Sequence, residues 1–341
     1  MSVFNQVDKV CSEIMGIDSP TGYTSKVMEY VKNYVEDLGL EFALTKKGLG
    51  YCYQKDEDKN LPIGLVSHVD TLGLMIRSIS SDGKINFTTV GGVSLPTVDG
   101  EYCKIYTRAG EVYTGTILSN SPSVHVYKDA RSLERNVDNM YIRLDNEVHS
   151  KDDVLELGIC NGDYIAIDTK YTSVNGFIKS RFLDDKLCVA QSLVLLKNRV
   201  EKNLRTPYVY FSAQEEVGFG FSNVPLVDKI DDLLVLDMGC VGLDLEGSEY
   251  KVSICALDGG GPYNYDFNTT LINLAKDNKL DYAVDCYKFY SSDGSASLKA
   301  GNDFRVALIG AGVHGSHGME RVHQKGIDNC QKLVELFLDT L

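Results

Sequence analysis

Apolar residues recur with helical spacing in several parts of the chain. Residues 24–38 carry apolar side chains at positions 27, 31, 34 and 38, which predicts a helix capped by Thr24 and ended by Gly39. The segments "DDKLCVAQSLVLLKNRVEKN", "TTLINLAKDNK" and "GIDNCQKLVELFLDTL" are also predicted to be helical. Helices are therefore expected near the start of the chain and again from residue 184 onward.

Short apolar runs lie between these helices and predict buried strands. Residues 40–53 contain two short predicted strands around "KKGLG", and "LPIGLVSHVD" contains a strand that runs through Val66. The segments "TPYVYFSA", "DLLVLDMG" and "FRVALIG" are predicted as further strands. Strands that alternate with helices favour an α/β fold, in which a mainly parallel sheet is sandwiched by helices.

Residues 73–169 follow a different pattern. Here "IRSISSDGKINFTTVGG", "EYCKIYTRAGEVYTGTI" and "DYIAIDTKYT" alternate apolar and polar residues around "SDG" and "RAG" turns. The segment "SKDDVLEL", with Ser150 as a possible cap, is the one short helix predicted here. We therefore expect a discontinuous α/β domain, residues 1–72 and 170–341, with a small β-rich domain, residues 73–169, inserted into it.

Composition and charge narrow the class of protein. The formal net charge of -14 disfavours nucleic acid and anionic membrane as partners, because both select for basic surfaces. None of the nine cysteines lies within four residues of another, so reduced thiols in a cytosolic protein are the simplest interpretation. The start of the chain does not have the pattern of a secretory signal, and no apolar run approaches the ~18–20 residues of a membrane helix. A soluble, cytoplasmic protein is expected.

Histidines and carboxylates stand where the predicted parallel strands end, and such ends meet at one edge of a sheet. Taken singly, each has an ordinary explanation; paired aspartates before a helix usually cap it, and "QEE" is usually a solvated loop. Their joint occurrence in five segments is what points to a site. These residues are His68 and Asp70, Asp184 and Asp185, Glu215 and Glu216, Asp237, and a loop with His314, His317 and His323.

Ligands of this type, without cysteine, suit zinc, cobalt or manganese in a catalytic role. Five ligand-bearing segments exceed the needs of one catalytic zinc ion and fit two ions ~3.5–4 Å apart, bridged by a carboxylate. Two such ions lower the pKa of a bound water and polarise a carbonyl group under attack. A neighbouring carboxylate must then move the proton. The doublet of Glu215 and Glu216 can supply one metal ligand and one general base.

The order of "HVD", "FLDDK", "QEEVG", "VLDMG" and a C-terminal histidine resembles a known family. It is that of the dinuclear metalloaminopeptidases, which includes the tetrahedral, dodecameric aminopeptidases and the glutamyl aminopeptidases. The resemblance covers nearly the full chain and includes "GGGP" at 259–262 and "SSDGSASLKAG" at 291–301. The C-terminal "SHGMERVH" differs from the commoner "RYxHSxxE" form and resembles a less studied branch. The place of the insertion, between His68 and Asp184, also resembles this family. Related carboxypeptidases and deacylases place their extra domain later in the chain.

The resemblance implies a role for each residue of the constellation. It makes Asp184 the bridge between two ions, Glu215 the catalytic base and Asp70 a group that orients His68. The implied metal ligands are His68, Asp184, Glu216, Asp237 and His317.

Ungapped counting from Gly310 places His317 at the position of the last ligand. His323 and His314 stay open as alternatives. Cys240, three residues beyond Asp237, is expected to be a structural thiol.

The resulting expectation is a two-metal aminopeptidase that acts on short peptides, with zinc, cobalt or manganese as the divalent ion. The resemblance also implies a homo-oligomer, in which the inserted domain forms dimers that assemble into a twelve-subunit shell. A carboxypeptidase or N-acyl amino acid deacylase with the same ligands is the main alternative, and a non-catalytic metal-binding protein is another. A glycosidase would leave the histidines unexplained.

Overall fold

The computed structural model describes residues 2–341 and divides into two compact units. One unit comprises the chain up to Asp70 together with Lys170–Leu341, and the other comprises Thr71–Thr169. The helices are α1 (Val3–Met15), α2 (Ser25–Asp37), α3 (Lys151–Glu156), α4 (Leu183–Glu201), α5 (Tyr265–Asp277), α6 (Asp293–Lys299) and α7 (Gln324–Leu338).

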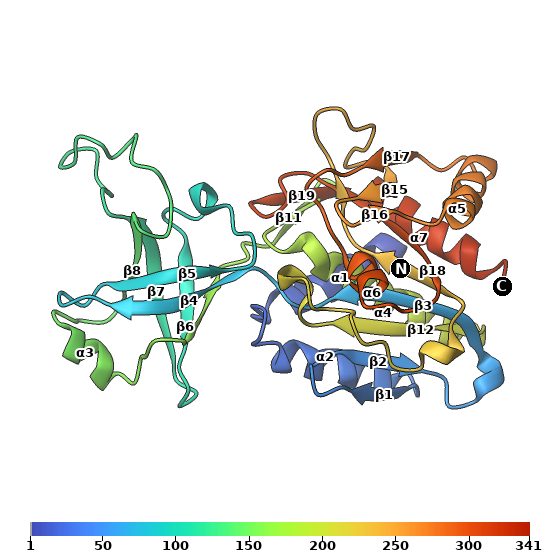
Figure 1. Cartoon of the computed structure of the whole chain (residues 1–341), viewed down its shortest axis with the longest axis horizontal. Helices are drawn as coiled ribbons and strands as arrows, with labels where there is room; N and C mark the ends of the chain where they lie inside the picture. Colours follow the sequence, from blue (N-terminus) through green and yellow to red (C-terminus); the bar gives the residue numbers. More distant parts are fainter. Residues whose placement is uncertain (1) are drawn as a thin grey trace. The chain divides into compact units, whose positions relative to one another are not determined.

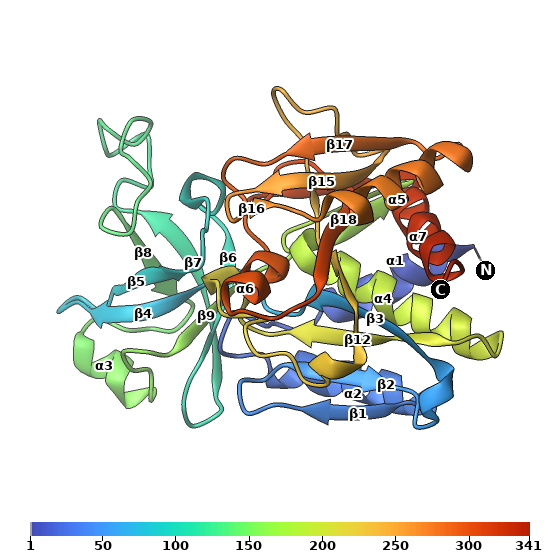
Figure 2. The ribbon, with the colours of Figure 1, turned by 45° about the vertical axis from the view of Figure 1, so that its right-hand side comes forward.

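The first unit contains the longer sheet. Its strands are β1 (Glu41–Leu44), β2 (Gly50–Tyr53), β3 (Asn60–His68), β12 (Thr206–Ser212), β13 (Asp232–Leu236), β14 (Gly239–Cys240), β15 (Val252–Asp258), β16 (Gly261–Pro262), β17 (Tyr282–Cys286) and β18 (Arg305–Val313). Their order is β1-β2-β12-β3-β13-β18-β15-β16, with β17 beside β15 and β14 beside β18. Figures 1 and 2 show β1, β2, β12 and β3 in the lower part of this unit and β15 and β17 in its upper part. A second sheet contains β10 (Thr172–Val174), β11 (Phe177–Ser180) and β19 (Glu320–His323).

The centre of the longer sheet is parallel. Strand β3 pairs in parallel with β12 and β13, and β13 pairs in parallel with β18. Antiparallel pairs occur towards the margins, between β1 and β2, β2 and β12, and β15 and β18. Helix α4 packs on β3 and β12, α7 packs on β18 and β15, and α6 contacts β13 and β18. The predicted α/β class with a mainly parallel sheet is thereby confirmed.

The sequence pattern missed several elements of this unit. Helix α1 was not predicted, although its buried residues Phe4, Val7, Cys11 and Ile14 follow a helical spacing. Helix α5 begins at Tyr265, four residues before the predicted start, because the Asn264 side chain accepts a hydrogen bond from the backbone of its first turn. Strands β15 and β17 were also missed; β17 has only five residues and includes a buried aspartate.

The second unit is a closed barrel. Its strands are β4 (Gly73–Ile79), β5 (Ile85–Val90), β6 (Tyr102–Tyr106), β7 (Val112–Ser119), β8 (Met140–Leu144) and β9 (Tyr164–Ile167). They close in the order β4-β5-β8-β7-β6-β9, around buried residues such as Ile76, Phe87 and Ile105. Helix α3 begins with a capping box, in which Ser150 and Asp153 bond each other's backbone N–H groups.

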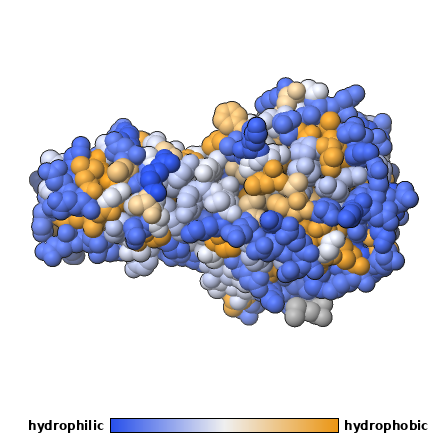
Figure 3. All heavy atoms as spheres, turned by 90° about the horizontal axis from the view of Figure 1, so that it is seen from below, coloured by the Kyte–Doolittle hydropathy of each residue, from blue (hydrophilic) through white to orange (hydrophobic). Residues whose placement is uncertain are grey.

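The surface is mainly polar on the face drawn in Figure 3, where hydrophobic atoms form small separate patches. Among residues 2–341, every helix is too short or too polar to span a lipid bilayer.

Candidate functional site

The parallel strands of the first unit deliver the candidate residues to one sheet edge. His68 is the last residue of β3 and lies in register with Ser212, the last residue of β12. A short helical turn, Glu215–Val217, follows β12, and Asp237 directly follows β13. Asp184 lies in the first turn of α4. The structure therefore brings together side chains that are far apart in the sequence.

One group of possible metal ligands contains His68, Asp184 and Asp237. One donor atom from each lies within 4.8 Å of the others, and all three residues are buried. The His68 Nε2 atom lies 3.2 Å from Asp184 Oδ1.

A second group contains Asp184, Glu216 and His317, again with one donor atom each within 4.8 Å of the others. His317 Nε2 lies 3.5 Å from Asp184 Oδ2 and 3.6 Å from Glu216 Oε2. Asp184 thus directs one carboxylate oxygen to His68 and the other to His317. This is the arrangement required of a carboxylate that joins two ligand groups.

The electrostatics of the cluster favour a bound cation. Burial, together with the charge of Asp184, raises the pKa of Glu216 well above its usual value and that of Asp237 to about 7. Burial also opposes protonation of His68, but hydrogen bonds with Asp184 and Asp70 outweigh it and hold the His68 pKa above its usual value. Several acids are therefore crowded into a space with little water.

The donor set also fits a divalent metal ion. The Glu216 Oε1 atom is buried and has no hydrogen-bond partner within residues 2–341, a costly arrangement that a cation would relieve. Nitrogen and oxygen donors without thiolates match zinc, cobalt or manganese.

Glu215 lies beside the cluster rather than in either ligand group. Its Oε2 atom is 3.6 Å from His68 Nε2, and burial raises its pKa well above the usual value. Asp70 holds the backbone here, since its two carboxylate oxygens accept from the N–H groups of Glu215 at 3.2 Å and Glu216 at 3.3 Å. The hydroxyl group of Thr21 donates to the second of these oxygens at 2.6 Å.

Asp70 also contacts His68, mainly through its backbone. The Asp70 carbonyl oxygen lies 2.9 Å from His68 Nδ1, and the nearer carboxylate oxygen lies 3.5 Å away. The carboxylate of Asp185, the neighbour of Asp184, accepts from the His68 backbone N–H at 3.1 Å.

Neither His314 nor His323, the two alternatives for the last ligand, belongs to either ligand group. His323 caps α7, and its ring packs against Phe177 and Tyr250 with centroid distances of 4.6 and 4.7 Å. His314 is exposed and pairs through its backbone with Arg321.

Cys240 is half-buried. Burial and the nearby Asp237 charge raise the pKa of its thiol to about 12, which is not the state of a reactive thiolate.

Two acidic residues near the cluster received no role from sequence reasoning. Asp293, at the start of α6, accepts from the Ser212 hydroxyl at 3.2 Å, and burial raises its pKa to about 7. Glu320 accepts hydrogen bonds from the backbone N–H groups of Asp184 and His317. The position of Glu320 three residues after His317 is a signal that sequence reasoning could have used.

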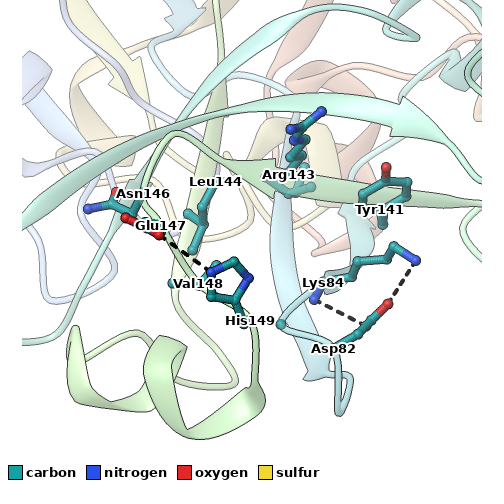
Figure 4. A pocket seen from close by; sticks show the side chains of 11 residues that line it. Asp82, Lys84, Tyr141, Arg143, Leu144, Asn146, Glu147, Val148 and His149 are labelled. Atoms are coloured by element: carbon teal, nitrogen blue, oxygen red, sulfur yellow. Dashed lines mark hydrogen bonds and ion pairs between the residues drawn. The ribbon is translucent and has the colours of Figure 1, made fainter.

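A separate hollow of about 410 Å³ occurs in the barrel unit, where the β4–β5 turn faces β8 and the segment after it (Figure 4). Its charged groups largely satisfy one another; Asp82 pairs with Lys84 at 2.8 Å, and Glu147 lies 3.6 Å from His149. The hollow contains none of the candidate site residues.

Comparison with known proteins gives matches over most of the chain. A family model described as M42 glutamyl aminopeptidase matches residues 48–333. YhfE of Bacillus subtilis (strain 168), which bears an aminopeptidase name, is 39% identical over 345 residues, covering 100% of this chain and 99% of its own. The glutamyl aminopeptidase of Lactococcus lactis subsp. cremoris (strain MG1363) is 26% identical over 247 residues, covering 68% of this chain and 65% of its own.

Two solved structures share the fold over nearly the whole chain. The TET aminopeptidase from the marine sediment archaeon Thaumarchaeota archaeon SCGC AB-539-E09 has a TM-score of 0.87 at 20% identity, covering 99% of this chain and 97% of that one. The TET1 peptidase of Pyrococcus horikoshii, which can assemble into a tetrahedron or a large octahedral shell, has a TM-score of 0.83 at 20% identity, covering 99% of both chains.

Proposed function

Because the chain belongs to the M42 glutamyl aminopeptidase family, we propose that it is a two-metal aminopeptidase that removes N-terminal residues from short peptides. The family assignment makes the chain a hydrolytic aminopeptidase, as its sequence motifs predicted. The two-ion mechanism and the residue roles that follow are our proposal.

The observation that carries the proposal is the double role of Asp184. Its two oxygens face two different histidines, and each histidine has a further carboxylate beside it. In this proposal, one ion is held by His68, Asp184 and Asp237, and the other by Asp184, Glu216 and His317. Two divalent ions bound here would polarise the scissile carbonyl and make an attacking water more acidic.

Glu215 moves the proton in the proposed reaction. Its carboxylate is free of both ligand groups but lies beside His68, where it accepts a proton from the attacking water and delivers it to the leaving nitrogen. Asp70 keeps this carboxylate in place by holding the backbone N–H of Glu215. The site therefore combines metal ligands, a proton carrier and a group that fixes its position.

The proposal includes self-association. The TET1 peptidase of Pyrococcus horikoshii can assemble into a tetrahedron or a large octahedral shell. We extend such assembly to this chain as a homo-oligomer built from dimers of the 73–169 domain. Light scattering measures the mass directly, and a monomer at all concentrations would contradict this part of the proposal.

Two variants test the catalytic role. Glu215→Gln is expected to keep both ions and lose nearly all turnover of amino-acyl anilides, whereas Glu156→Gln, which alters an exposed residue of α3, should behave as the wild type. Metal content is measured on the same samples. A Glu215→Gln enzyme with most of its activity would refute the role of this residue.

The substrate class is tested separately. Amino-acyl anilides and peptides with free N-termini should be cleaved, and N-blocked peptides with free C-termini should not. Chelation should abolish turnover, and zinc, cobalt or manganese should restore it. Full activity in a metal-free preparation would exclude the two-ion mechanism.

A further inference from the structure

The buried Glu320 joins two segments that carry proposed metal ligands. Its Oε2 atom accepts from the backbone N–H of Asp184 at 2.9 Å, and its Oε1 atom accepts from the backbone N–H of His317 at 3.0 Å. Only 2% of the Glu320 surface is exposed. Both carboxylate oxygens are thus engaged with the main chain of other residues.

The turn that presents His317 needs such support. His317 has a φ angle of 62°, in the left-handed region that residues with a side chain rarely adopt. The Gly318 N–H donates to Gly315 O at 3.1 Å, and Arg181 Nη1 donates to Gly318 O at 3.2 Å. Glu320 connects this turn to the first residues of α4.

Side chains also connect the His317 turn to Asp184. The Ser316 hydroxyl donates to Asp184 Oδ2 at 3.2 Å, and this oxygen lies 3.5 Å from His317 Nε2. A shift of the turn relative to α4 would therefore change the distance between the two proposed ligands. His68 and Asp237 reach the site from elsewhere, at the ends of β3 and β13.

We propose that Glu320 is a positioning residue that sets the distance between Asp184 and His317, and thereby the affinity of the second ligand group for its ion. This inference rests on the proposed two-metal function. It assigns Glu320 no contact with metal or substrate. The expected consequence is selective. Binding of the ion in the second group is weakened much more than binding of the ion held by His68, Asp184 and Asp237, because only the second group includes His317.

The test compares Glu320→Gln with Glu249→Gln. Glutamine keeps the shape of the side chain but replaces one acceptor oxygen with an NH₂ donor that faces a backbone N–H. Glu249 is a matched control, because it lies beside the same strand but pairs with Arg321, at 2.8 Å. Calorimetric titration of the metal-free proteins with zinc measures both affinities, and elemental analysis measures the ions retained per subunit.

Glu320→Gln should retain the first ion and bind the second about 10- to 100-fold more weakly, the usual effect of losing a group that orients a ligand. Glu249→Gln should bind both as the wild type does. Raising the zinc concentration should then restore turnover of Glu320→Gln, which a general loss of structure would not allow. Unchanged affinity for both ions would overturn the inference.

Failure of the proposed function would give a different result, because the wild type itself would then bind fewer than two ions or work without them.

Should Glu320→Gln not fold, Glu320→Asp provides the same comparison, since its shorter side chain keeps the charge but cannot reach both N–H groups. Equal weakening of both ions in the folded variant would also contradict a selective role.

Discussion

Asp70→Asn tests whether one buried carboxylate holds the turn of Glu215 and Glu216. Asp70 is fully buried, and its carboxylate accepts hydrogen bonds from the two backbone N–H groups and from Thr21. Asparagine has nearly the same shape but carries one acceptor oxygen in place of two. At least one donor of this set would then face the NH₂ group of the new side chain.

The size of the effect follows from these contacts. A buried donor left without an acceptor costs about 1–3 kcal/mol. Two charge effects accompany this cost in the metal-free protein. Asp70 adds to the effect of burial in raising the pKa values of Glu216 and Asp293, and the substitution removes that repulsion, but it also removes the interaction of Asp70 with His68. We therefore expect the free energy of unfolding to fall by about 1 kcal/mol. Activity should fall by about 10- to 100-fold, since both glutamates move.

The assay pairs denaturant unfolding of the metal-free protein with kcat/KM on an amino-acyl anilide at saturating zinc. Thr21→Val serves as the matched variant, because it removes only the hydroxyl donor and leaves both backbone N–H groups bonded to Asp70. Its activity should stay close to that of the wild type. An Asp70→Asn enzyme with undiminished kcat/KM would show that the turn keeps its position without the carboxylate.

Three further outcomes are expected. Burial is the largest cause that raises the pKa of Asp237 to about 7 and the pKa of Glu320 to about 8. Both acids have pKa values near 4 in the unfolded chain, so the folded metal-free protein holds more protons than the unfolded chain from about pH 4 up to about pH 7–8. Its free energy of unfolding should fall as pH rises through this window, and a pH series that shows no fall would contradict it; bound zinc should remove the slope. Gly220→Ala should cost about 1–3 kcal/mol in denaturant unfolding, because the new Cβ would lie 2.0 Å from an Asp293 oxygen, whereas Gly242→Ala, with open space around it, should be neutral. His323→Ala should keep the wild-type metal content by elemental analysis, since its ring packs on aromatic side chains; loss of an ion would identify it as a ligand.

Much of the fold and of the candidate site could be predicted from the sequence, because the carboxyl ends of parallel strands meet at the same edge of a sheet. His68, Glu215 and Asp237 each follow an apolar run, and the parallel pairing of β3 with β12 and β13 brings these ends together. The role proposed for Glu320 was only partly accessible in this way. Its spacing from His317 is visible in the sequence, but its partners are backbone N–H groups at a tight turn, which carry no signature in the side-chain pattern.

The structure also gives a physical reason for two adjacent glutamates after a buried strand. Because Asp70 binds both of their N–H groups, the turn is fixed and the two side chains leave it in different directions. Glu215 Oε2 lies 3.6 Å from His68, and Glu216 Oε2 lies 3.6 Å from His317. One short acidic turn thereby serves both halves of the site. In the proposed mechanism the two carboxylates are separable, so Glu216→Gln should lose an ion, whereas Glu215→Gln should keep both ions and lose turnover.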